Sequence, residues 1–196
     1  MKRRHFFFAA LCIPQHAWAN KVYPARKLVE AATSQIGVTT LYDPAYMKLA
    51  YPNGDVMLDR GVCTDVVIRA YRQGLGIDLQ QLVHNDMARN FASYPKTWGL
   101  SKPDSNIDHR RVPNLQRFFA RKKAELAMSD DYSSYQAGDL VTMMLPGHLP
   151  HIGIVSNKRY EVSGRPLLIH NIGAGTQEED ILATYPHTGH YRFALG

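Results

Sequence analysis

The sequence predicts an α+β domain in which N-terminal helices pack on a small antiparallel β-sheet. In the first half, apolar residues recur at helical spacing and are followed by glycine or proline. In the second half, short segments rich in Val, Ile, Leu, Thr and Tyr are separated by Gly, Pro and Asn. Helices that precede strands in this way are typical of an α+β domain.

Residues 1–19 resemble a secretory signal peptide, with basic residues at 2–4, an apolar run at 6–13 and a small-x-small cleavage site at 17–19. The apolar run is much shorter than the ~20 residues that span a bilayer. An uncleaved N-terminal anchor is the alternative. We expect the chain to be secreted through the inner membrane into the periplasm, with no stable membrane insertion after signal cleavage.

Cleavage leaves residues 20–196, the size of one domain with room for a substantial core. The formal net charge is +6 for the whole chain, and the remaining 20 basic and 17 acidic residues give +3. A charge this small does not indicate nucleic acid as a partner. It suits anionic envelope polymers or peptide carboxylates, and oligomeric state is not predicted.

Helical spacing predicts a first helix over 24–36 and a second over 63–73, each followed by glycine. Asp78 can cap a third helix and Asn114 a fourth. Between the first two, residues 38–62 are expected to form a loop because they contain two prolines and an Asn-Gly pair. A long loop beside a candidate nucleophile often forms a wall of a site.

Antiparallel strands are predicted at 139–145, 151–155, 167–172 and 190–194. The polar, proline-containing stretch 94–113 is expected to lack regular structure. It is either a lid or recognition element, or a surface loop with local salt bridges.

Cys63 is the only cysteine left after signal cleavage, because Cys12 lies in the signal. It stands at the start of a predicted helix, where unpaired N–H groups and the helix dipole favour an anion and lower a thiol pKa. The same N–H groups can hold an oxyanion. A lone thiol in an oxidising compartment is either buried and inert or a nucleophile, and a nucleophile needs a partner base.

His151 is the candidate base, because it begins a predicted strand and can point into a cleft. The alternative is a surface histidine at a turn. His170 or Asn171, at the end of another predicted strand, would orient the imidazole. Strand alternation places these two side chains on opposite faces, so only one of them can serve.

The order of these segments resembles that of the NlpC-type cell-wall cysteine peptidases, which have a minimal papain-like fold. The matching segments are Ser34–Gly37 followed by Tyr42, Cys63 at a helix start, Gln136–Val141, His151–Val155 and Ile169-His170. The resemblance covers roughly residues 28–172. It implies a peptidase or amidase with a Cys-His-His or Cys-His-Asn triad, peptidoglycan stem peptides as substrates, an oxyanion donor at Tyr42, and no metal or organic cofactor.

Three stretches are similar to a family of exported bacterial proteins known as domain of unknown function 1287. They are Gly61–Tyr71, Asn106–Leu115 and His170–Gly175. This similarity extends over nearly all of the chain that follows the signal, and it bears on the fold more than on any substrate.

The sequence departs from the peptidase pattern at two places. The usual Asp-Cys-Ser-Gly is replaced by Val-Cys-Thr-Asp, so Asp65 stands two residues from the thiol and either repels a thiolate or binds a substrate amine. The stretch 94–113, which includes His109, has no counterpart. Candidate substrate-binding residues near these departures are His109 and the arginines that could bind substrate carboxylates, Arg60, Arg110 and Arg111.

Three other functions remain open. The chain could be a non-catalytic module that binds envelope peptides or a protein partner and keeps a degenerate cysteine site. It could transfer an acyl group to an amine instead of water. It could also be a zinc amidase, although Pro150 interrupts the H-x-x-H spacing. The ligands of such a zinc site would come from His148, His151, His170, His187 and His190.

Overall fold

The computed structural model describes the backbone of residues 16–195 and the side chains of residues 23–195. Its helices are α1 (His16–Thr33), α2 (Cys63–Leu75), α3 (Leu79–Asn90) and α4 (Val112–Arg121). Its strands are β1 (Leu41–Tyr42), β2 (Arg60–Gly61), β3 (Glu125–Leu126), β4 (Leu140–Leu145), β5 (Leu149–Arg159), β6 (Pro166–His170), β7 (Gln177–Glu179) and β8 (His187–Tyr191). Short 3-10 turns are η1 (Phe91–Ser93), η2 (Asp108–Arg110) and η3 (Tyr132–Ser134).

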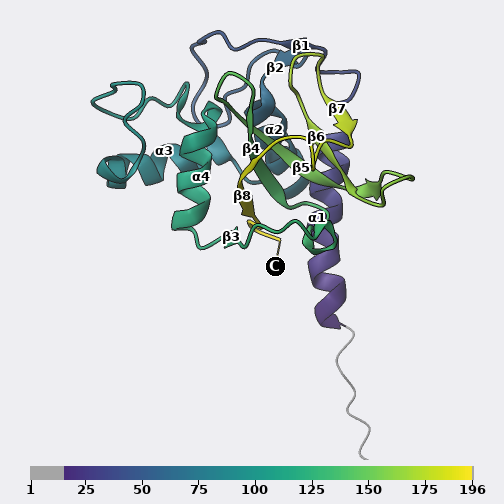
Figure 1. Ribbon diagram of the computed structural model, residues 1–196. Helices are drawn as coiled ribbons and strands as arrows, with labels where there is room; N and C mark the ends of the chain where they lie inside the picture. The colour runs from purple at the N-terminus through teal and green to yellow at the C-terminus, as the bar shows by residue number, and fades with distance from the viewer. Residues whose placement is uncertain (1–15, 196) are drawn as a thin grey trace, which may run out of the picture.

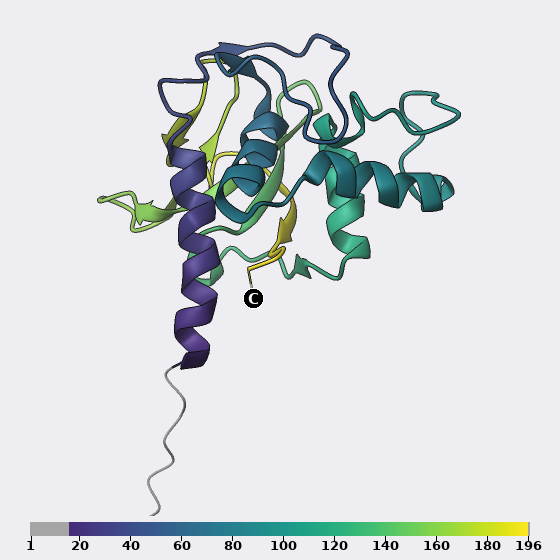
Figure 2. The same ribbon diagram turned by 180° about the vertical axis from the view of Figure 1, so that it is seen from behind.

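The main sheet has the strand order β3-β8-β4-β5-β6-β7, with every neighbouring pair antiparallel. Helices α1 and α2 lie side by side against one face of this sheet, and α3 and α4 flank it (Figures 1 and 2). β1 and β2 form a separate parallel pair above the start of α2. The predicted α+β fold, with N-terminal helices packed on a small antiparallel sheet, is confirmed.

The central strands bury side chains on both faces of the sheet. Ile152 and Ile154 of β5 pack with the helices in the larger core. Met143, Val155 and Leu168 form a second core on the opposite face. Because successive side chains of a strand alternate between faces, His151 shares the face of Met143, its direct partner in β4.

Helix α2 is held in the centre of the fold by its buried apolar residues and by a glycine that lets α1 approach. Its inward residues Val66, Val67, Ala70 and Tyr71 have essentially no solvent exposure. Gly74 allows α1 to approach closely, since a Cβ at this position would lie 2.6 Å from a backbone oxygen of α1. Helix α2 therefore holds its first residue, Cys63, at a defined place beside the sheet.

The loop 38–62 is fastened to α2 by the buried side chain of Arg69. The guanidinium pairs with Asp55 at 2.9 Å and donates to the hydroxyl of Thr39 at 3.0 Å. It also donates to the backbone carbonyls of Val56, Met57 and Arg60. The predicted loop is thus an ordered wall above the start of α2.

Several predicted boundaries differ from the structure: α1 begins before and ends before the predicted 24–36, and β5 extends beyond the predicted 151–155 at both ends. Helix α4 begins at Val112, and Pro113 occupies its first turn, where a missing N–H costs nothing. Asn114 is therefore not a cap, and its amide instead donates to the Asp108 carbonyl at 3.0 Å. Strand β8 (His187–Tyr191) lies three residues earlier at each end than the predicted 190–194, because its first residues are polar and include a glycine, which hid them from the aliphatic pattern.

Residues 1–15, which contain most of the predicted signal peptide and Cys12, lie outside the described residues. The predicted cleavage site at 17–19 falls in the first turn of α1. Within residues 16–195, each helix is too short or too polar to cross a bilayer. Signal cleavage remains a prediction.

Candidate active site

Cys63 is the first residue of α2, as predicted. Asp65 caps the start of the helix, because its carboxylate accepts a hydrogen bond from the backbone N–H of Val62 at 2.7 Å. Backbone N–H groups of Cys63, Thr64 and Ile152 are directed at the sulfur. Since Ile152 directly follows His151, the thiol lies against the backbone of β5 one residue from the predicted base. The Cys63 side chain belongs to the core on the helix-bearing face of the sheet, whereas His151 shares the opposite face with Met143.

The thiol is protonated in the resting protein. The pKa of Cys63 is raised to about 12, chiefly by burial and in part by the nearby Asp65 carboxylate, although the surrounding N–H groups lower it. The N–H groups at the helix start lower the pKa of this thiol as expected, but burial outweighs them. The physical reason is that a residue only 5% exposed loses the hydration that a thiolate needs.

Alkylation with iodoacetamide should show this protonated state. We expect the folded protein to react more slowly than a free cysteine peptide at pH 8, with the rate still rising above pH ~9, because only the thiolate is nucleophilic. Mass spectrometry of the Cys63 peptide after timed reaction measures the rate. A rate that levels off below pH ~8.5 would contradict this expectation.

A pocket of about 200 Å³ leads from solvent to Cys63. Its walls come from the loop 38–62, the start of α4 and the stretch 94–113, which had been expected to be either a recognition element or a plain surface loop. The residues that line it with Cys63 are Tyr42, Pro44, Val62, Trp98, Ile107, Arg110, Arg111, Val112, Pro113 and Pro150. The sulfur is thus buried but has a route to solvent.

His151 lies near the start of β5 and is 2% exposed. Its Nε2 is buried and has no hydrogen-bond partner. Burial, and then the neighbouring His170, lower the pKa of His151 to about 3. At neutral pH the imidazole is therefore uncharged, which is the form that can accept a proton.

The two candidates for the third position have separate contacts. The ring of His170 packs edge-on against the ring of His151, with centroids 5.1 Å apart. Asn171 points to the other side and donates from Nδ2 to the carbonyl of Gly61 at 3.1 Å. Only His170 adjoins His151, while Asn171 ties β6 to the segment that leads into Cys63.

Asp65 and Arg110 form a buried ion pair at the start of α2. Arg110 donates from Nε and an amino nitrogen to the two carboxylate oxygens at 3.0 and 2.9 Å. It also donates to the backbone carbonyls of Asp43 and Ala45. The structure thus gives Asp65 and Arg110 a structural role, instead of the predicted roles in binding a substrate amine or carboxylate.

The other predicted binding residues differ in their surroundings. Arg60 is paired with Asp59 at 3.1 Å and with Asp43 at 3.4 Å. His109 is buried beyond the pocket lining, and burial followed by the Arg110 charge lowers its pKa to about 3. Arg111 lines the pocket with its guanidinium 4.1 Å from the centre of the Trp98 ring.

Tyr42 lines the same pocket. Burial raises its pKa to about 12, and the adjacent Cys63 and Asp65 contribute to this rise. The phenol therefore keeps its proton at neutral pH and can donate a hydrogen bond beside the sulfur.

The histidines predicted as zinc ligands are not gathered together. Within residues 23–195, no group of three or more His, Cys, Asp or Glu side chains has the spacing needed to hold a metal ion. His187 contacts Tyr135 and the Leu182 carbonyl, and His190 contacts Asp139. These contacts argue against the zinc amidase alternative.

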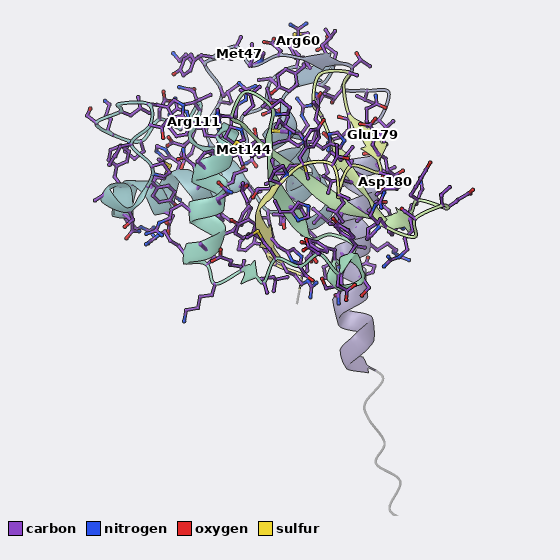
Figure 3. All side chains as sticks on the ribbon, viewed as in Figure 1. Met47, Arg60, Arg111, Met144, Glu179 and Asp180 are labelled. Atoms are coloured by element: carbon purple, nitrogen blue, oxygen red, sulfur yellow. The ribbon has the colours of Figure 1, made fainter. Side chains whose placement is uncertain are left out.

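Sequence reasoning missed two residues near the site, Trp98 and Glu179. Trp98 is the only tryptophan after the predicted signal, which could have marked it. Glu179 lies on the three-residue strand β7, 3.1 Å from Nε2 of His170. In Figure 3, Arg111 and Glu179 appear on opposite sides of the view, over α4 and beside β7.

Comparisons with known proteins confirm the similarity to the family known as domain of unknown function 1287. The family model described as "Domain of unknown function (DUF1287)" matches residues 29–193. "Uncharacterized protein YijF" from Escherichia coli (strain K12) is 55% identical over 166 residues, which cover 85% of this chain and 80% of that protein. The crystal structure of an N-acetylmuramoyl-L-alanine amidase from Bacteroides uniformis aligns with a TM-score of 0.49 and 12% identity, covering 86% of this chain and 97% of the other. A likeness of this degree supports no conclusion about activity.

Proposed function

We propose that this chain, which belongs to the DUF1287 family, is a periplasmic cysteine peptidase or amidase that cleaves peptidoglycan stem peptides. The observation that carries the proposal is the position of Cys63. Its thiol lies at a helix start, lines a pocket open to solvent, and adjoins the backbone of the residue that follows His151. Acyl transfer to a thiol requires such an accessible sulfur and a base that can reach it.

In the proposed reaction the thiol of Cys63 attacks the carbonyl carbon of an amide while His151 accepts the thiol proton. Burial disfavours a lone thiolate and a lone imidazolium. The proposed transfer therefore requires the imidazole to come within hydrogen-bond reach of the sulfur, where the two charges stabilise each other. His151 then protonates the leaving amine as the C–N bond breaks. Water hydrolyses the resulting thioester, with His151 again as the base, and restores the thiol.

The oxyanion of the tetrahedral intermediate has two donors within the pocket. The backbone N–H of Cys63 is unpaired at the helix start, and Tyr42 supplies a protonated phenol beside the sulfur. Donors that are already in place before the reaction stabilise the developing charge at little cost of reorganisation.

The substrate is proposed to place an anionic group against Arg111. Arg110 is neutralised by Asp65, whereas Arg111 faces the pocket with the Trp98 ring as its close partner. Burial lowers the pKa of Arg111 although the Asp108 and Asp104 carboxylates act against this, and a bound carboxylate would favour the charged guanidinium further. Stem peptides carry such carboxylates, and this supports the proposed substrate class.

Replacing Arg111 with alanine is expected to raise KM about tenfold for a substrate with a free carboxylate, with little change in kcat. The reason is that the charge pair contributes equally to the bound ground state and transition state. The measurement is steady-state cleavage of two matched peptides, one with its carboxylate free and one with it amidated. An equal rise in KM for both peptides would contradict the assigned role.

Digestion of purified peptidoglycan fragments tests the function itself. The wild-type protein should release products with new free amines, and mass spectrometry of those products identifies the bond cleaved. The absence of any cleavage, together with a Cys63 thiol that reacts only after denaturation, would refute the proposal.

A second candidate is a non-catalytic module that binds envelope peptides. Two observations favour it. The raised pKa of Cys63 keeps the thiol protonated, and Nε2 of His151 has no hydrogen-bond partner. Under this alternative the pocket would bind peptides and leave them intact. Acyl transfer to an amine uses the same geometry as hydrolysis, and products formed in the presence of added amines distinguish it.

A further inference from the structure

His170 is a fully buried imidazole with an acidic neighbour on the next strand. β7 pairs with β6 in antiparallel register, with Glu179 opposite Leu168 and Gln177 opposite His170. The Glu179 carboxylate reaches along the strand to within 3.1 Å of the His170 Nε2. It approaches away from the direction of the ring N–H, so the contact has not the geometry of a formed hydrogen bond.

The nitrogens of this cluster are unpaired in a dry environment. Nε2 of His151 and Nδ1 of His170 are buried without a hydrogen-bond partner, and they belong to rings whose centroids are 5.1 Å apart. A buried polar nitrogen without a partner costs free energy, so these two nitrogens have reason to bond to each other. Such a bond requires one of them to carry the proton and the other to be bare.

The protonation of His170 is defined by its surroundings. Burial lowers the pKa of His170 to about 4, so the ring is neutral at neutral pH and carries one proton on one of its nitrogens. The Glu179 side chain is 51% exposed and is therefore free to turn. A carboxylate beside Nε2 favours the tautomer with the proton on Nε2.

We infer that Glu179 is a positioning residue that fixes the tautomer of His170. A small turn of its exposed side chain lets it accept the Nε2–H of His170, which leaves Nδ1 of His170 as the acceptor for the Nε2–H of His151. His151 then presents Nδ1 as the base for the Cys63 thiol. This inference rests on the proposed function for its catalytic consequence, but the tautomer itself does not depend on any activity.

Nitrogen-15 spectra of the histidine rings test the tautomer directly in the full chain. Wild type should show His170 protonated at Nε2 and bare at Nδ1. In Glu179→Ala the His170 signals should shift toward a mixture of tautomers. Glu179→Gln keeps an acceptor oxygen and should retain the wild-type tautomer. An unchanged His170 tautomer in Glu179→Ala would overturn the inference.

Kinetics then test the consequence. We expect Glu179→Ala to lower kcat about tenfold with KM unchanged, because the carboxylate acts through His170 and does not touch the substrate. Glu161→Ala is the matched control, since Glu161 is an exposed acid on the neighbouring β5–β6 turn, and it should leave kcat and the His170 tautomer unchanged.

The two readouts separate the two proposals. A changed tautomer with unchanged kcat would overturn the positioning role while leaving the hydrolase intact. If wild type cleaves no peptidoglycan fragment, the hydrolase proposal fails, and the spectra still decide whether Glu179 sets the tautomer.

Discussion

Replacing Cys63 with alanine is expected to reduce cleavage of stem-peptide amides by about 10,000-fold or more. The reason is that the covalent path is lost outright, and the remaining donors can only bind the substrate. Quantifying released amines from a defined peptide, over hours for the variant and minutes for wild type, covers this range.

The control is to show that Cys63→Ala still folds, by measuring its unfolding free energy. Cys63 is small, so alanine removes one sulfur atom and should cost about 1 kcal/mol of unfolding free energy or less. The double variant Cys63→Ala/His151→Ala should be no less active than Cys63→Ala alone, because residues that act as a unit are not additive. Activity of the single variant within tenfold of wild type would refute the assigned nucleophile.

Replacing Arg110 with alanine is expected to lower the unfolding free energy by about 3–5 kcal/mol. Both members of the Asp65–Arg110 pair are nearly inaccessible, with side chains 4% and 2% exposed. The variant would leave the Asp65 carboxylate buried without its cation and would release two carbonyls of the loop 38–62. Urea unfolding followed by circular dichroism measures the loss.

The matched control is Arg117→Ala, which removes an exposed arginine from α4. It should change stability by no more than about 0.5 kcal/mol. If Arg110→Ala were equally mild, the buried pair would not hold the start of α2, and the pocket wall would depend on apolar contacts alone.

Sequence reasoning reached the parts of this fold that are encoded locally. Helix α2 follows from an apolar face within thirteen residues, and β4 and β6 follow from short runs of aliphatic residues between turns. The placement of Cys63 at a helix start followed from the same pattern. Periodicity needs only near neighbours, which is why these elements were predictable.

What escaped prediction depends on residues far apart in the chain. The pKa of Cys63 is set by burial against β5, and Arg110 meets Asp65 across 45 residues of sequence. Glu179 belongs to a strand of three residues, too short for any alternation to be recognised. No local pattern specifies burial or a distant ion pair, so the sequence indicated the candidate residues but not their electrostatic state.

The end of β6 contacts both parts of the candidate site, the imidazole of His151 and the backbone that precedes Cys63. Two consecutive residues point to opposite sides there, His170 toward the imidazole of His151 and Asn171 toward the backbone that leads into the thiol. A one-residue slip in register would exchange the two side chains and disconnect both parts at once.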